Sequence, residues 1–127
     1  MAQQPLNQYK TITGIVSTSN VGIYTTRTGY TSIVLYAQVA NTGAGVGTVT
    51  FYHERDVRSS SGTISTTTTE IINKGLVPPN DALILLDGRL VLEKTALKTD
   101  RIRMVGVSST NPNHLKYTVS ILETLNQ

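Results

Sequence analysis

The stretch Val77-Pro-Pro-Asn-Asp-Ala-Leu-Ile-Leu-Leu-Asp-Gly-Arg-Leu-Val-Leu-Glu93 holds the highest density of apolar residues in the chain. Its two adjacent prolines enforce an extended entry, because each ring fixes φ and removes a backbone donor. The Asn-Asp pair that follows favours a turn, and the Asp87-Gly88 pair favours a second turn between two short apolar runs. The stretch therefore predicts a tight apolar corner between short strands, which is typical of a β-sandwich or a barrel.

Segments on both sides of this corner alternate between apolar and polar residues, as strands with one buried face do. The alternation extends over residues 32–39, 48–55, 101–107 and 115–121. In each segment the alternation places the more apolar side chains on one face, which we expect to be the buried face. In chain order these side chains are Ile33, Leu35, Ala37 and Val39; Val49, Phe51 and His53; Ile102 and Met104; and Leu115, Tyr117, Val119 and Ile121.

Three connecting segments have patterns of their own. The glycine-rich residues 41–47 lack the Gly-Lys-Ser/Thr ending of a phosphate-binding loop, and they predict a hairpin or loop between two strands. The threonine-rich residues 64–72 indicate an exposed or edge strand. Residues 93–100 are the only helix-compatible segment, and they are barely two turns long.

The whole chain of 127 residues contains 20 Thr and 10 Ser, with little charge and few aromatic residues. Thr and Tyr favour pleated, half-buried surfaces, so the composition predicts an all-β protein. Roughly eight or nine short strands at regular turn spacing indicate one antiparallel β-sandwich or jelly-roll-like domain over residues 1–127. Polar chain ends fray unless something holds them, so we expect residues 1–8 to form an arm that partner contacts order.

Charge and composition also restrict the classes of partner. The net charge of +3 is too small to indicate a nucleic-acid-binding surface. The N-terminal residues have neither a charged start nor an apolar run, so neither a signal peptide nor a membrane span is expected. The absence of cysteine excludes a disulfide framework and a thiolate metal site.

Residues able to carry catalysis or to bind metal are few and scattered. His53 shares its predicted face with apolar residues, and no second His, Asp or Glu lies at ligand spacing on that face. Asp81, Asp87 and Asp100 lack the calcium-loop pattern, and a turn accounts for each of them. The serines at 59–61 lack the Gly-x-Ser-x-Gly context of a nucleophile. We therefore expect no enzyme activity, no metal, no cofactor and no small-molecule ligand.

The remaining candidate residues suit a protein interface. The basic residues at 89–103 lack the interleaved aromatics that stack on bases, so they indicate either a solvated face or a surface that pairs with an acidic protein partner. Two tyrosines on polar strand faces favour a protein contact over sugar stacking in this Trp-free chain. The residues that we expect at an interface are Tyr36, Tyr52, Pro78, Pro79, Lys94, Lys98, Arg101 and Arg103.

An ordered set of short motifs runs through residues 21–125. Its members are Val39-Ala-Asn-Thr42, Thr48-Val-Thr50, the corner at residues 77–83, Gly88-Arg-Leu-Val-Leu-Glu93 and Thr118-Val-Ser-Ile-Leu-Glu123. In this order the motifs resemble the small β-sandwich virion proteins of tailed bacteriophages, especially those of cyanobacterial phages. The chain departs from that pattern where residues 94–99 replace a tight Gly-Asp turn, so the contacts of this loop are not carried over.

The resemblance implies a non-enzymatic virion structural protein that forms homo-oligomers and is assembled into the virion in the host cytoplasm. Its partner would be the major capsid protein or another virion protein. The first hypothesis is a decoration or cement protein that binds and stabilises the head. Two alternatives stay open: an adaptor at the neck, tail or fibre base, and a carbohydrate-binding module for host glycans.

Overall fold

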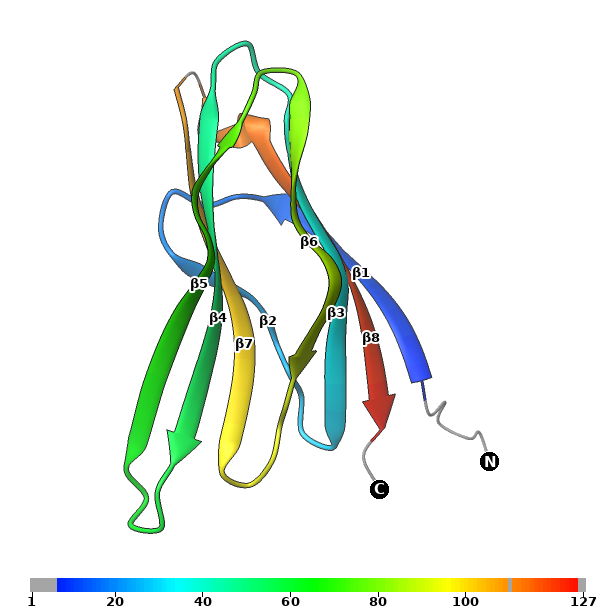
Figure 1. Ribbon diagram of the computed structural model, residues 1–127, viewed down its shortest axis with the longest axis vertical. Helices are drawn as coiled ribbons and strands as arrows, with labels where there is room; N and C mark the ends of the chain where they lie inside the picture. The colour runs from blue at the N-terminus through cyan, green and yellow to red at the C-terminus, as the bar shows by residue number, and fades with distance from the viewer. Residues whose placement is uncertain (1–6, 110, 126–127) are drawn as a thin grey trace.

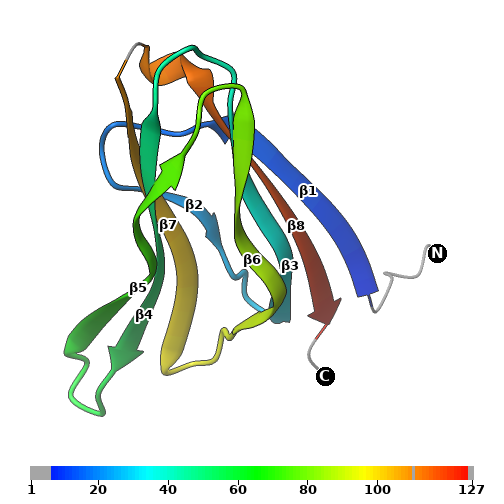
Figure 2. The same cartoon turned by 45° about the horizontal axis from the view of Figure 1, so that its top comes forward.

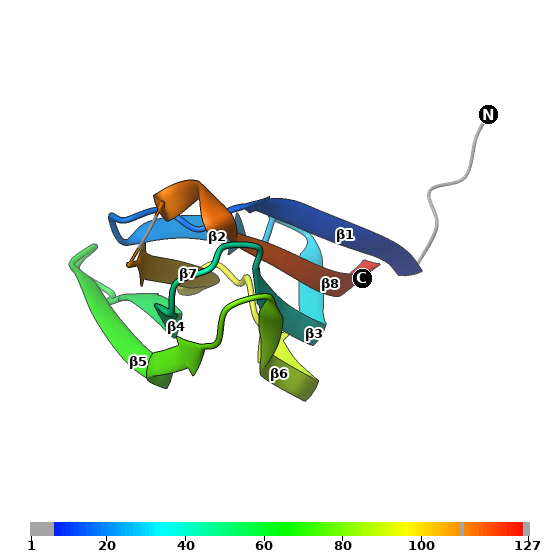
Figure 3. The same cartoon turned by 90° about the horizontal axis from the view of Figure 1, so that it is seen from above.

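A computed structural model describes residues 7–109 and 111–125 of the chain. This part contains eight strands in two four-stranded antiparallel sheets that lie face to face (Figures 1 and 3). Sheet A has the order β1-β8-β3-β6, with bounds β1 (Asn7–Ile15), β8 (Leu115–Leu125), β3 (Tyr30–Asn41) and β6 (Asp81–Leu92). Sheet B has the order β2-β7-β4-β5, with bounds β2 (Val21–Thr25), β7 (Lys98–Ser108), β4 (Gly47–Arg58) and β5 (Ile64–Val77). A short 3-10 helix, η1 (Pro112–His114), precedes β8.

The strand order is that of an eight-stranded jelly roll. Apart from the β4–β5 hairpin, each connection between consecutive described strands passes from one sheet to the other. Two sheets built in this way from Greek keys form the double-sheet jelly roll. The prediction of an all-β sandwich or jelly-roll-like fold is therefore confirmed.

The connections gather at the two ends of the sandwich. The β3–β4 and β5–β6 connections and η1 lie together at one end (Figure 2). The β2–β3 and β6–β7 connections lie at the opposite end, together with the β4–β5 hairpin (Figure 1). We call this second end the hairpin end.

The core fills the space between the inner faces of the two sheets. Phe51, Leu92, Ile102, Met104 and Ile121 are among its largest fully buried side chains. Each such side chain contributes about 2 kcal/mol through removal of apolar surface from water. The buried faces predicted for residues 48–55, 101–107 and 115–121 are the faces that supply this core.

Strand β3 differs from its predicted alternation because it contains a bulge. Its pairing with both neighbouring strands shifts register between Val34 and Tyr36. The extra residue, Leu35, points outward together with Tyr36, so the inward and outward positions exchange at this point. Val34 and Ala37 are buried, whereas Ile33 lies on the outer face. The predicted buried face is therefore correct after the bulge and wrong before it, at Ile33 and Leu35.

The predicted corner at Pro78 and Pro79 is present, and it carries the chain from β5 in sheet B to β6 in sheet A. Both prolines are exposed. Asn80 completes the turn with a φ of 56°, a left-handed conformation that Asn tolerates better than most residues.

The second predicted turn, at Asp87-Gly88, is wrong. Both residues lie within β6, which runs as one edge strand through a register shift opposite β3. Gly88 has a φ of 148° there, which a side chain would not favour. The apolar residues of β6 consequently divide between the core, which receives Leu92, and the outer face, which carries Ile84 and Val91.

Several other segments were expected to have a particular form. Residues 41–47 connect the two sheets as a loop, which is one of the two predicted alternatives, and β5 is an edge strand as predicted. Residues 93–100 are not helical: they form a loop that leads into β7. Asn7 and Gln8 of the expected arm belong to β1, and residues 1–6 of the arm lie outside the described residues. Within the described chain, no helix is long and apolar enough to cross a membrane.

Candidate functional surfaces

Clusters of potential metal ligands are absent from the described part of the chain. Nowhere in residues 7–109 and 111–125 do three or more His, Asp or Glu side chains gather closely enough to hold a metal ion. The hairpin serines bond to their own hairpin, since the Ser59 and Ser61 hydroxyls lie 2.8 Å apart and Ser59 Oγ accepts from the Thr63 amide at 3.1 Å. The chain instead presents two differently built outer faces and the hairpin end.

The outer face of sheet B, called face B, carries a network of paired charges. Arg101 on β7 donates to Glu54 Oε1 and to Asp56 Oδ2 on β4, both at 2.5 Å. Arg103 donates to the side-chain and backbone oxygens of Asn20 at 2.9 and 2.8 Å. The guanidinium groups of Arg101 and Arg103, both predicted at an interface, are therefore already paired within the chain.

Asp100 is a fully buried carboxylate at the hairpin end of β7. Arg55 on the neighbouring strand binds it with two hydrogen bonds, from Nε to Oδ1 at 2.7 Å and from Nη2 to Oδ2 at 2.8 Å. The Glu93 amide donates to Oδ2 at 2.9 Å, and His53 Nε2 lies 3.5 Å from the same oxygen. Burial by itself raises the pKa of Asp100, but the hydrogen bonds from Arg55 and the Glu93 amide outweigh it and hold this pKa below its usual range.

Two sequence-based interpretations are corrected by this cluster. Asp100 does not serve a turn: it lies inside a strand, with no exposed surface. His53 does have an acidic neighbour, which comes from β7 and not from its own strand. Spacing along one strand cannot show a partner that strand pairing brings in from residue 100.

Glu123 on β8 is a second fully buried carboxylate, and it links the two sheets. The Tyr24 hydroxyl of β2 donates a short hydrogen bond to Glu123 Oε2, while the other oxygen accepts from Arg27 at 3.0 Å and lies 3.5 Å from Lys10 Nζ. Burial raises the pKa of Glu123, but the Tyr24 hydroxyl and the charges of Lys10 and Arg27 bring it below its usual value. Burial, followed by the hydrogen bond to Glu123, raises the pKa of Tyr24 to about 12.

Acid is therefore expected to destabilise the fold. The folded-state pKa values of Asp100 and Glu123 lie below their unfolded values of about 4. Their stabilisation is fully present at neutral pH and is lost as the pH falls through the unfolded and then the folded values. We expect the urea midpoint to fall steadily below about pH 5. A midpoint that stays constant down to about pH 3 would contradict the assigned ion pairs.

The outer face of sheet A, called face A, is nearly free of charge. Strand pairing places Tyr9, Leu122, Ile33 and Val91 in one row across all four strands. The neighbouring rows, toward the end of the sandwich that carries η1, contain Thr, Ser, Gln, Ala and Ile side chains together with Tyr36. The Tyr36 hydroxyl donates a hydrogen bond to the Gln38 side-chain oxygen at 2.7 Å. The charged residues in these rows are Asp87 and Lys116, and the exposed Arg89 lies between the Asp87 and Val91 rows, where β6 shifts register.

The eight residues predicted at an interface do not form one surface. Tyr36 lies on face A, whereas Tyr52 lies on face B with Arg101 and Arg103. The proline pair lies in the β5–β6 connection at one end of the sandwich. At the opposite end, Lys94 lies in the β6–β7 connection and Lys98 begins β7 (Figure 1). Nothing in the sequence indicated that Arg55 and Glu123 take part in buried charge clusters. Their partners come from other strands, so no local pattern marks them.

Comparison with solved structures finds chains with a similar arrangement of strands, and comparison of the sequence finds none. No family model and no curated protein matches this sequence. A chain of T=1 particles derived from infectious bursal virus is 9% identical with a TM-score of 0.50, over 94% of this chain and 32% of that chain. A chain of the Gt strain of infectious bursal disease virus is 8% identical (TM-score 0.48), over 94% of this chain and 31% of that chain. In the VP2 subviral particle the identity is 10% and the TM-score 0.45, over 94% and 33% of the two chains. This chain spans about a third of the length of each, and at such identity the likeness to the T=1 particle chain shows a shared β-sandwich fold.

Proposed function

We propose that this chain is a non-enzymatic structural protein of a bacteriophage virion, and that it decorates the head by binding across subunits of the major capsid protein. The observation that carries the proposal is the jelly-roll strand order, in a fold shared with a chain of virus-derived particles. The ordered motifs at residues 21–125, which resemble phage virion proteins, support it independently. A modest contact area per copy suffices for such a role when many copies act together.

Face A is the surface that we assign to the capsid. Its rows are mostly apolar or uncharged polar, with Asp87, Arg89 and Lys116 as the charges on or beside them. Depletion of charge together with an aromatic residue such as Tyr36 is typical of the buried part of a protein interface. Face B carries paired charges that would be costly to remove from water, so we assign it to the solvent side.

The deletion experiment tests the proposed role. Virions that lack the protein should release their DNA at a lower temperature or a milder osmotic shock than complete virions. The stained band of the protein should correspond to hundreds of copies per particle. About a dozen copies would instead place it at the neck or tail, where binding partners are few. Normal particle stability together with binding on a glycan array would replace the proposal with the carbohydrate-binding alternative.

Val91→Glu on face A is expected to weaken binding to the capsid by about thirtyfold, because the new carboxylate would be buried without a partner at a cost of about 2 kcal/mol. Val91 is 47% exposed, so the fold itself should change little. The matched control is Val107→Glu, the same chemical change at a 57% exposed position on face B. Co-sedimentation with capsids that lack the protein measures both. Equal binding by the two variants would mean that face A is not the contact.

A further inference from the structure

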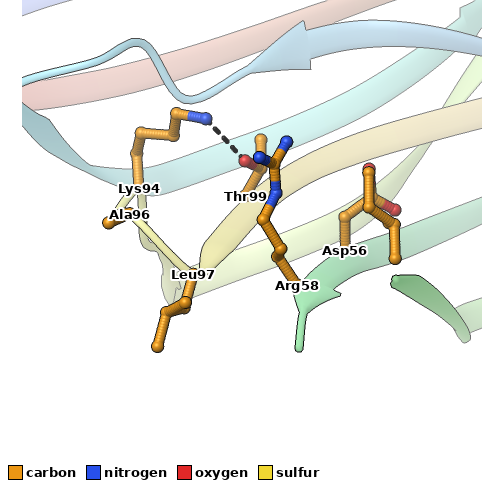
Figure 4. Close-up of a pocket in the computed structure, with 7 residues that line it drawn as sticks. Asp56, Arg58, Lys94, Ala96, Leu97 and Thr99 are labelled. Carbon is orange, nitrogen blue, oxygen red and sulfur yellow. Dashed lines mark hydrogen bonds between the residues drawn. The ribbon is translucent and has the colours of Figure 1, made fainter. Parts of the chain in front are cut away.

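A concave site at the hairpin end lies between the β4–β5 hairpin and the β6–β7 connection. The cavity has a volume of about 200 Å³. Arg58 and Asp56 line it from the end of β4, and Lys94, Leu97 and Thr99 line it from the other side (Figure 4). In Figure 4 the side chains of Arg58 and Lys94 both reach toward Thr99.

The cavity holds more positive charge than its own carboxylate can neutralise. Lys94 Nζ donates to the Thr99 hydroxyl at 2.6 Å, and within the described chain neither Lys94 nor Arg58 has a carboxylate within ion-pair distance. Asp56 is the carboxylate of the lining, and both of its oxygens are engaged elsewhere: Oδ1 accepts from Thr66 at 2.7 Å and Oδ2 from Arg101. Two cations in one cavity repel each other, and a bound anion would relieve that repulsion.

The other basic residues around this end already have acidic partners. Arg55 is paired with Asp100, Lys98 lies 3.7 Å from Glu93, and Arg101 is paired with both Glu54 and Asp56. Of the basic residues at 89–103, Lys94 and the exposed Arg89 have no ion pair within the described chain, and Lys94 is the one that lines the cavity. Arg58 is a second cation there, which the sequence did not single out.

The loop that carries Lys94 is held in place by hydrogen bonds. The Arg58 amide donates to the Leu97 carbonyl at 2.7 Å, which ties the loop to the end of β4. The Thr95 hydroxyl accepts from the Leu97 and Lys98 amides at 3.2 and 3.1 Å, and the Thr95 amide donates to the Lys98 carbonyl at 2.9 Å. A loop that is fixed before binding loses less conformational entropy when a ligand arrives.

The side chains at the rim of the cavity suit an anionic group carried by a peptide better than one carried by a sugar or a nucleotide. Ile64 and Leu97 border it with exposed aliphatic side chains, 53% and 55% accessible. No aromatic residue lines it, so a sugar ring or a base would have no stacking surface. A neighbouring depression that reaches Thr28 and Gly29 shares both Arg58 and Lys94, which leaves room for an extended chain to continue past the cavity.

We propose that this cavity binds the carboxylate of an acidic side chain in an extended segment of a partner protein, with Arg58 and Lys94 as its two cationic contacts. The aliphatic neighbours of that side chain pack on Ile64 and Leu97. This inference does not depend on the virion role, because it rests on the charge and shape of the hairpin end alone.

The test is an NMR titration of the isotopically labelled full chain with two peptides, acetyl-Leu-Glu-Leu-amide and acetyl-Leu-Gln-Leu-amide. The Glu peptide should shift the amide signals of residues 94–99 at millimolar concentration, and the Gln peptide should bind at least about tenfold more weakly. Arg58→Gln and Lys94→Gln should each weaken binding of the Glu peptide by roughly tenfold. Added salt should weaken it further, because both cations are near the surface.

The matched control is Arg89→Gln, which removes the same charge from an exposed position on β6 and should change the affinity less than about twofold. A charge-reversal variant shows whether a loss of binding comes from misfolding. Arg58→Glu should lose affinity for the Glu peptide and gain affinity for acetyl-Leu-Lys-Leu-amide, which a misfolded protein would not do. The proposal is overturned if no signal shifts, if the Glu and Gln peptides bind equally, or if Arg89→Gln weakens binding as much as Arg58→Gln. Tighter binding of inorganic phosphate or of N-acetylneuraminic acid than of the Glu peptide would also overturn it.

Discussion

Arg55→Met is expected to lower the free energy of unfolding by about 3 kcal/mol at neutral pH, because it leaves the buried Asp100 carboxylate without its cation. Asp100 has no exposed surface, and Arg55 supplies two of its short hydrogen bonds, at 2.7 and 2.8 Å. Methionine keeps most of the length and the apolar contacts of the arginine stem, so the loss reports the ion pair. Chemical unfolding in urea measures the change.

The pH dependence of the loss identifies its cause. Without Arg55, Asp100 would take up a proton more readily, so the difference between wild type and variant should shrink as the pH falls toward about 4. Adding Asp100→Asn to the variant should recover part of the loss, because a neutral amide costs less to bury than a lone carboxylate. The control is Arg58→Met, which removes an arginine without an ion pair and should change stability by less than about 0.5 kcal/mol. A loss below about 1 kcal/mol for Arg55→Met would show that Asp100 does not depend on this pair.

Phe51→Ala is expected to cost about 4 kcal/mol, the range for truncation of a fully buried phenylalanine. Phe51 is the single phenylalanine of the chain, and it lies at the centre of β4 with no exposed surface. Its removal would leave a cavity between two sheets whose backbones are held by hydrogen-bonded ladders, so the site cannot collapse fully. Calorimetry or urea unfolding should show the loss directly.

The control for this truncation lies on the same strand. Val57 also belongs to β4, but it is 39% exposed, so Val57→Ala should cost less than about 1 kcal/mol. A loss for Phe51→Ala no larger than that for Val57→Ala would mean that Phe51 does not fill the core between the sheets. Retained cooperativity in both would show that the jelly roll unfolds as one unit.

The strands of the core were predictable because their signal is local. In β4 and β8 the side chains alternate without interruption, so Phe51 and Val119 could be placed inside from spacing alone. The same argument failed in β3, where a bulge at Leu35 reverses the alternation. It also failed in β6, where Gly88 and Arg89 are left unpaired by a register shift inside one strand. A bulge depends on how a strand fits its neighbours, and no single segment records that fit.

The candidate sites were predictable only in part. Lys94 was among the residues expected to contact a partner, and it does line the charged cavity at the hairpin end. Arg58 was not, because in the sequence it starts a polar loop with no pattern to mark it. The distinction between Lys94, which has no carboxylate within ion-pair distance in the described chain, and Arg101, which has two, also required the structure.

The fold class follows from local features of the sequence. Thr-rich composition, two-residue alternation and the Pro78-Pro79 corner are properties of short segments, and each acts through the backbone or through the face that a strand presents to water. The partners of the buried carboxylates depend on tertiary structure, because Asp100 meets Arg55 and Glu123 meets Tyr24 across 45 and 99 residues of chain. Strand order and register bring these groups together, and the hydrogen bonds and charges of the partners then hold the pKa of each carboxyl group below its usual range in spite of burial.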